Sequence, residues 1–185
     1  MKTFVKILVI LFISQTVSSQ SLSLNLQNSV GFTIVDVESA WETELHDWGQ
    51  FSYSLVAQGI LNKDNGLSIG AETGLQRLYY WEERYYAYVP DPVPRYRWGT
   101  IWTLHIGAIL EKKFENNFYL QSGVNARIFL DGSGVTPGIL AAAGYELYIS
   151  DSFRIPLGLR IDIVFGNATP IPVTLGAGLK YNLEL

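Results

Sequence analysis

The sequence predicts an all-β protein, a transmembrane eight-stranded antiparallel up-and-down β-barrel. Three observations predict it: apolar residues recur at every second position, no window beyond the N-terminus has helical spacing, and the links between alternating segments differ systematically in length. The final stretch, IPVTLGAGLKYNLEL, keeps its alternation to the last residue. A chain end this regular is expected to be held as a strand whose apolar side faces a dry environment.

Residues 1–19 are interpreted as a secretory signal peptide, which leaves residues 20–185 as the mature barrel domain. Lys2 and Lys6 precede an apolar run that closes on small residues. This run is about half the roughly 20 residues that a spanning helix needs, so an N-terminal membrane anchor is the weaker alternative. The chain has no cysteine, which argues against both a disulfide framework and a lipid-modified cysteine.

Eight alternating segments follow the signal. They are expected near 21–35, 48–61, 66–80, 95–111, 117–130, 136–149, 153–165 and 171–185. The links after the second, fourth and sixth segments are short, and the first of them, NKDNG, is typical of a hairpin turn. The links 36–47 and 81–94 are long, and such asymmetry is typical of barrels that cross a membrane. Both chain ends are then expected on one side, the periplasmic side.

The polar face of the segments decides which face points inward. It consists mainly of Ser, Gly, Asn, Gln and Thr, with only one or two charges in most segments. A soluble barrel of the lipocalin kind, the main alternative, would carry a charged exterior. The predicted segments are also longer than the usual five or six residues of soluble strands and long enough to cross a bilayer. The sequence therefore favours a membrane barrel with a small polar lumen.

Aromatic residues gather at the predicted ends of the strands. One group is Trp48, Tyr79, Tyr80, Trp81, Tyr96 and Trp98, and the other is Phe114, Phe118, Phe153 and Tyr181. Aromatic girdles at both membrane interfaces are expected in such barrels. Ordinary β propensity would explain the aromatic content but not its clustering at strand ends.

Strand parity turns a set of charged side chains into the lumen. The predicted lumen charge cluster consists of Glu72, His105, Arg127, Glu146, Arg160, Asp162 and Lys180. Counting residues from the short links places Glu72, His105, Arg160 and Lys180 at a similar depth. Because eight strands enclose an interior just wide enough for side chains, these charges must be paired, and a salt-bridged plug is predicted. A proton or ion path is the alternative.

The sequence argues against catalysis. The histidines are His46 and His105, and Ser122 on the neighbouring strand is expected on the opposite face from His105. A nucleophile and a base on opposite faces cannot act together. We therefore expect no enzyme activity, no metal and no cofactor. Without Lys2 and Lys6 the formal charge changes from -4 to -6, which argues against nucleic acid as a partner.

The segment YYWEERYYAYVPDPVPRYRW, residues 79–98, is the candidate contact surface. It holds six of the eleven tyrosines together with Trp and Arg, residue types that are enriched in contact surfaces. The candidate contact residues are Trp81, Arg84, Tyr85, Tyr86 and Tyr88. A sugar or protein ligand would suit them. The alternative interpretation is two strand ends that carry interfacial aromatics.

With its signal, eight strands and terminal GLKYNLEL, the chain resembles the small eight-stranded outer-membrane β-barrels of Gram-negative bacteria, the OmpA transmembrane domain and OmpX type. The resemblance implies a location in the outer membrane, in contact with phospholipid and lipopolysaccharide. It also implies insertion by the outer-membrane assembly machinery, which reads the last strand, although this chain ends in Leu185 where many members end in Phe. The expected role is structural or surface interaction by a monomer. A lipid A deacylase or phospholipase and a small-solute pore are the alternatives.

Overall fold

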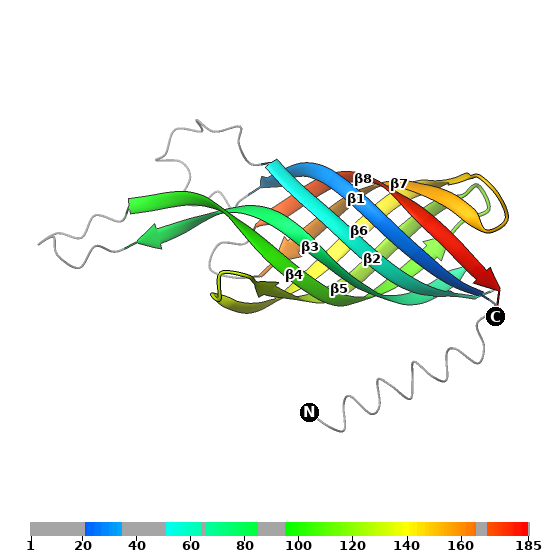
Figure 1. Cartoon of the computed structure of the whole chain (residues 1–185), viewed down its shortest axis with the longest axis horizontal. Helices are drawn as coiled ribbons and strands as arrows, with labels where there is room; N and C mark the ends of the chain where they lie inside the picture. Colours follow the sequence, from blue (N-terminus) through cyan, green and yellow to red (C-terminus); the bar gives the residue numbers. More distant parts are fainter. Residues whose placement is uncertain (1–20, 35–50, 64–65, 85–94, 166–169, 185) are drawn as a thin grey trace, which may run out of the picture.

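A computed structural model describes residues 21–34, 51–63, 66–84, 95–165 and 170–184, with the backbone alone described for 79–84 and 95–99. Within these residues eight antiparallel strands close into a barrel in sequence order (Figure 1). The predicted fold class is confirmed. The strands are β1 (Ser21–Ile34), β2 (Phe51–Asn62), β3 (Leu67–Arg84), β4 (Arg95–Lys113), β5 (Phe118–Phe129), β6 (Gly134–Tyr148), β7 (Phe153–Val164) and β8 (Ile171–Glu184).

The alternation of the sequence becomes an alternation of burial. In β1, Ser23, Asn25 and Gln27 are buried, whereas the intervening Leu24 and Leu26 are about half exposed. The other strands show the same pattern of exposed apolar and buried polar side chains, so the outer face is apolar and the lumen carries the polar side chains. Exposing this apolar surface to water would be unfavourable, because apolar side chains stabilise a protein only when they are removed from water. The outer face therefore suits a lipid environment. Among the described residues no helix has the length and apolar character to span a membrane.

Three short links lie at the end of the barrel where β1 begins and β8 ends, which we call the terminal end. Two of them contain a residue in the left-handed region, Gly66 with φ of 70° and Asn117 with φ of 64°. The Gly66 N–H donates to the Lys63 carbonyl at 3.0 Å, and the Asn117 N–H donates to the Phe114 carbonyl at 3.1 Å. These turns explain why Gly and Asn occur in the two predicted hairpin links.

The opposite end of the barrel, the loop end, includes the short link 130–133 between β5 and β6. The Ser133 N–H donates to the Asp131 carboxylate at 2.9 Å. Hydrogen bonds from the side chain and the backbone of Ser133 lower the pKa of Asp131. The predicted signal peptide, Trp48 and the link 36–47 lie outside the described residues.

The hairpin of β3 and β4 projects beyond the other strands at the loop end (Figure 1). The predicted end of the third segment, near residue 80, was wrong, because the ladder continues to the pair Arg84 and Arg95. Pairing of β3 with β2 stops at Arg77, and pairing of β4 with β5 begins at Thr103. Within the described residues the hairpin therefore continues beyond the barrel wall as two paired strands.

When the strand pairing is followed once around the barrel, it returns to the starting strand ten residues away from its starting residue, and this offset is the stagger of the barrel. A row of paired residues that starts at Lys180 in β8 passes through Asn25, Gln58 and Glu72 in β1, β2 and β3. It continues through β4 to β7 and returns to β8 at Pro170, whose carbonyl accepts from the Val164 N–H. This stagger implies a strand tilt of about 40°. Since neighbouring strands lie about 4.8 Å apart, the row of paired residues rises by about 3 Å toward the loop end at each step to the next strand.

Aromatic pairs occupy the outer face near the terminal end. The rings of Phe114 and Phe118 have centroids 5.7 Å apart, and those of Phe153 and Tyr181 are 4.8 Å apart. Nearer the loop end, Tyr53 and Trp102 make an edge contact at 6.3 Å. The side chains predicted for the other girdle, from Trp48 to Trp98, lie outside those the structure describes. The described pairs are typical of membrane-interface positions.

Candidate functional site

The lumen contains two networks of buried charges, and the first lies near the middle of the barrel. This upper network consists of Glu72, His105, Arg127, Arg160 and Asp162. The Arg160 guanidinium donates two hydrogen bonds to the Glu72 carboxylate, both at 2.8 Å. It donates two more to Asp162, both at 2.9 Å. Fork-shaped contacts of this kind fix the position of both partners.

Arg127 and His105 complete the upper network. The Arg127 guanidinium lies 2.7 Å from the Asp162 carboxylate and also donates to the Gln76 side chain. The His105 Nε2 lies 3.5 Å from Glu72, and both ring nitrogens lack a hydrogen-bond partner within the described part of the chain. Two arginines therefore balance two carboxylates, which is the condition for charges that are almost completely buried.

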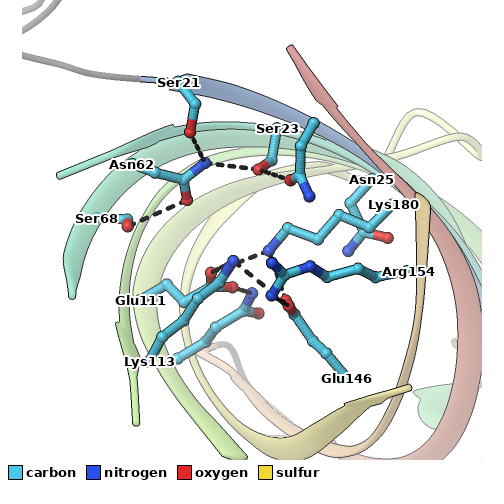
Figure 2. Close-up of polar contacts among 12 residues, drawn as sticks. Ser21, Ser23, Asn25, Asn62, Ser68, Glu111, Lys113, Glu146, Arg154 and Lys180 are labelled. Carbon is cyan, nitrogen blue, oxygen red and sulfur yellow. Dashed lines mark hydrogen bonds and ion pairs between the residues drawn. The ribbon is translucent and has the colours of Figure 1, made fainter. Parts of the chain in front are cut away.

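The second network lies toward the terminal end and consists of Glu111, Lys113, Glu146, Arg154 and Lys180 (Figure 2). The Lys180 ammonium lies between two carboxylates, 3.0 Å from Glu111 and 2.8 Å from Glu146. Arg154 donates to Glu146 at 3.2 Å. The Lys113 and Arg154 side chains are partly exposed, so this lower network is the one that meets solvent.

The prediction of one lumen cluster was therefore wrong in a specific way. The structure groups Glu72, His105, Arg127, Arg160 and Asp162 as predicted neighbours. It places Lys180 and Glu146, which were predicted for the same cluster, in the lower network with Glu111 instead.

Barrel stagger is the physical reason. Glu72 and Lys180 lie in the same row of paired residues, three strands apart. Three strands raise the row by about 9 Å, so equal residue counts from the links do not mean equal depth.

A chain of side-chain amides joins the two networks. The Gln58 amide donates to Glu72 at 3.2 Å and to the Gln121 oxygen at 3.4 Å. The Gln121 amide in turn donates to Glu111 at 2.6 Å, and Asn25 donates to Gln58 at 2.8 Å. Polar groups therefore connect the middle of the lumen to its terminal end.

Two clusters of apolar side chains also lie in the described lumen. One buried cluster, Ile60, Ile109 and Leu140, lies on three strands beside the amide chain. A second cluster, Leu78, Ile101 and Val164, packs with Phe129 toward the loop end. The lumen is thus less uniformly polar than the sequence pattern predicted.

At the terminal end the lumen opens into a vestibule of about 550 Å³. Its lining includes Lys113 and Arg154 of the lower network, together with Asn62, Ser68 and Asn182. Figure 2 shows the Asn62 side chain between Ser21, Ser23 and Ser68 at this mouth, with hydrogen bonds of 2.6 to 3.3 Å.

The similarity of this chain to known proteins lies in its structure. No family model matches the chain, and no curated protein matches it. Neisserial surface protein A matches with a TM-score of 0.56 and 10% identity, covering 86% of this chain and 96% of that one. The outer-membrane protein OprG of Pseudomonas aeruginosa matches with a TM-score of 0.55 and 10% identity, covering 91% and 98%.

The chain has the fold of the small eight-stranded outer-membrane β-barrels. At this level of identity the likeness concerns the fold alone. Any more specific property of this chain must therefore be inferred from its own lumen, outer face and loop end.

Within the described residues of this barrel, the candidate pair His105 and Ser122 forms no catalytic arrangement. His105 is 1% exposed and lies in the lumen, whereas Ser122 is exposed on the outer face. The barrel wall separates them, so they cannot act as base and nucleophile. Within the same residues no group of His, Cys, Asp and Glu could hold a metal ion.

The candidate contact residues fall partly outside the described residues. Trp81 and Arg84 lie in β3, where their backbones pair with Trp98 and Arg95 of β4. The remaining three, Tyr85, Tyr86 and Tyr88, are among the residues the structure does not describe.

Sequence reasoning missed Glu111, Lys113 and Arg154 as members of the lumen networks. The signal was present for Glu111, because the apolar residues of this strand have even numbers and Glu111 is odd. Glu111 is the last residue of the predicted segment 95–111. In the structure β4 continues to Lys113, so both residues are part of the barrel wall.

Proposed function

We propose that this protein spans the outer membrane of a Gram-negative bacterium, with its terminal end in the periplasm, and acts as a surface-contact protein. Its contact element is the ribbon, defined as residues 78–84 of β3 and 95–101 of β4. The lumen is closed and serves to hold the barrel rigid. Insertion by the assembly machinery through β8 belongs to this proposal, supported by the regular pairing of β8 with β1 along its whole length.

The outer face supports the membrane location. Large apolar side chains are exposed on every strand, from Leu24 in β1 to Leu175 in β8, which is 65% exposed. The aromatic pairs near the terminal end lie where a girdle would meet the lipid headgroups. Both features stabilise a barrel in lipid and would promote aggregation in water.

The ribbon is the single observation that carries the contact function. Its two strands pair with each other through Leu78 and Ile101 up to Arg84 and Arg95. Among the described residues, the side of β3 beyond Arg77 and the side of β4 before Trp102 have no strand partner. Strand edges without a partner among the described residues offer N–H and C=O groups that an extended segment of another protein can join.

A truncated barrel tests this function. In the truncated variant an Asn-Gly turn replaces residues 79–100, so that β3 and β4 end at the pair Leu78 and Ile101. Pairing of β3 with β2 and of β4 with β5 is untouched, because it ends at Arg77 and Thr103. The variant should keep its heat-modifiable gel mobility, which checks that the barrel folds.

Intact and truncated barrels in lipid nanodiscs are then compared on arrays of extended peptides and of glycans. We expect the intact barrel to bind a subset of peptides and the truncated barrel to lose that binding. Equal binding by both forms, or binding by neither, would contradict the ribbon as the contact element. Binding confined to glycans would assign the contact to side chains of the segment 79–98 rather than to the edges of the two strands.

The closed lumen distinguishes this proposal from a small-solute pore. Support comes from the two charge networks, the amide chain between them and the apolar cluster of Leu78, Ile101 and Val164 toward the loop end. A hydrated pore would require these buried groups to separate, at the cost of stranding charges in a narrow space. A lipid-modifying enzyme is disfavoured by the separation of His105 from Ser122.

A further inference from the structure

Asn28 is a side-chain amide on the outer face of the barrel. It is exposed, and so are Leu26 and Val30 on the same face, at 55% and 48%. Its chain neighbours Gln27 and Ser29 are buried in the lumen. The parity of β1 therefore fixes the Asn28 side chain outside the barrel.

Asn28 also lies at mid-height. It is the eighth residue of the fourteen in β1, and its cross-strand partners are Leu55 in β2 and Ala177 in β8. With a tilt of about 40°, six or seven residues correspond to about 15 Å of height on either side. The amide thus lies near the centre of the apolar belt, far from lipid headgroups and water.

The Asn28 amide has no hydrogen-bond partner within the part of the chain that the structure describes. Thr73, another polar residue on the outer face, differs because its hydroxyl donates to the His105 carbonyl at 3.0 Å. An asparagine has two donors and one acceptor oxygen to satisfy, and hydrocarbon offers a partner to none of them.

We propose that β1 is the interface of a dimer in the membrane, in which Asn28 of one copy hydrogen-bonds to Asn28 of a second copy. A carboxamide is both donor and acceptor, so a two-fold axis parallel to the barrel axis makes it complementary to itself. An acyl chain has neither group. The neighbouring Ala57 and Ala177 are small, which allows two barrel walls to approach closely.

This inference departs from the monomer that the sequence led us to expect. It rests on the membrane location proposed above and does not depend on the ribbon. The β1 face points sideways into the lipid, so a dimer leaves the loop end of both copies accessible. Two ribbons on one dimer would also raise the avidity of surface contact.

Energy transfer between labelled copies in lipid bilayers measures association. Because the chain has no cysteine, Lys63→Cys in the link after β2 provides a single labelling position next to β1. On this background we expect Asn28→Leu to weaken association roughly tenfold, as the loss of two hydrogen bonds in lipid predicts. Asn28→Gln, which keeps the amide, should largely retain it.

A second measurement locates the interface. Asn28→Cys and Val124→Cys each place one thiol on the outer face near mid-strand, and Val124 is 60% exposed on β5, halfway around the barrel. Under oxidation in dilute bilayers we expect a disulfide-linked dimer from Asn28→Cys and none from Val124→Cys.

Heat-modifiable mobility of the same samples reports insertion, so failure of the membrane proposal is recognised separately. The dimer is overturned if the inserted protein is monomeric at every protein-to-lipid ratio. The same result is expected if a protein of another kind covers Asn28 in cells, so that case also overturns the dimer. It is also overturned if Asn28→Leu associates as strongly as the parent, or if Val124→Cys cross-links as readily as Asn28→Cys.

Discussion

Replacing Glu72 by alanine removes one carboxylate from a buried network in which charges are balanced. Arg160 then loses two of its four hydrogen bonds, those to Glu72, and keeps the two to Asp162. Arg127 and Arg160 are left to share Asp162 as their only carboxylate among the described residues of this network. The variant therefore buries an unbalanced positive charge.

The expected cost follows from the burial of both partners, since Glu72 and Arg160 are each 3% exposed. Breaking a buried ion pair by removing one partner typically costs about 3 to 5 kcal/mol, because the other charge stays buried. The paired change Glu72→Leu with Arg160→Met removes both charges and leaves Arg127 with Asp162 at 2.7 Å. Replacing both partners by apolar groups is often nearly neutral, so this variant should cost about 1 kcal/mol or less.

The assay is urea unfolding of the barrel in lipid vesicles, followed by tryptophan fluorescence and by gel mobility. Glu115→Ala, an exposed carboxylate in the link after β4, is the matched control and should change the free energy of unfolding by less than about 0.5 kcal/mol. If Glu72→Ala costs less than about 1 kcal/mol, or if the paired variant costs as much as the single one, the balanced-network reasoning is refuted.

Three further predictions follow from the outer face, the lumen and the packing of one tyrosine. The protein in detergent should show β-type circular dichroism and a gel mobility that changes on boiling; a detergent-free soluble monomer would contradict the lipid-facing surface. Planar bilayers that contain it should carry little current, and reproducible large, stable conductance steps would show an open lumen. Gly144→Ala should cost about 1 to 3 kcal/mol, because its Cβ would lie 2.6 Å from the buried Tyr119 hydroxyl oxygen and close to the Leu157 carbonyl. Gly59→Ala, whose Cβ would have no neighbour within 4 Å, is the control, and an equal cost for both changes would rule out this packing argument.

Alternation of residue type was sufficient to predict the fold and the orientation of most side chains. The apolar residues of β3 have odd numbers, so Glu72 had to face the lumen, and the structure places it there at 3% exposure. Parity works because successive side chains of a strand point to opposite faces whatever the surrounding structure. The same argument turned Arg160 and Asp162 inward.

Depth could not be predicted in the same way. The vertical offset between strands depends on the stagger of the whole barrel, which arises from eight pairings at once and leaves no local trace in the sequence. This is why Lys180 was expected beside Glu72 and is found between Glu111 and Glu146. The inward apolar residues Ile60 and Leu140 were missed for a related reason, since a mixed lumen interrupts strict alternation.

Spin labels along β5 test the central claim, that alternate residues face lipid and lumen, most directly. A nitroxide is placed in turn at each position from Leu120 to Arg127, in a chain that has no other thiol. In bilayers we predict a period of two, with frequent collisions with lipid-dissolved oxygen at the even positions, such as Val124, and few at the odd positions, such as Asn125. A pattern with the opposite phase, or with no period of two, would contradict the assignment of inside and outside on which the networks, the closed lumen and the Asn28 interface all depend.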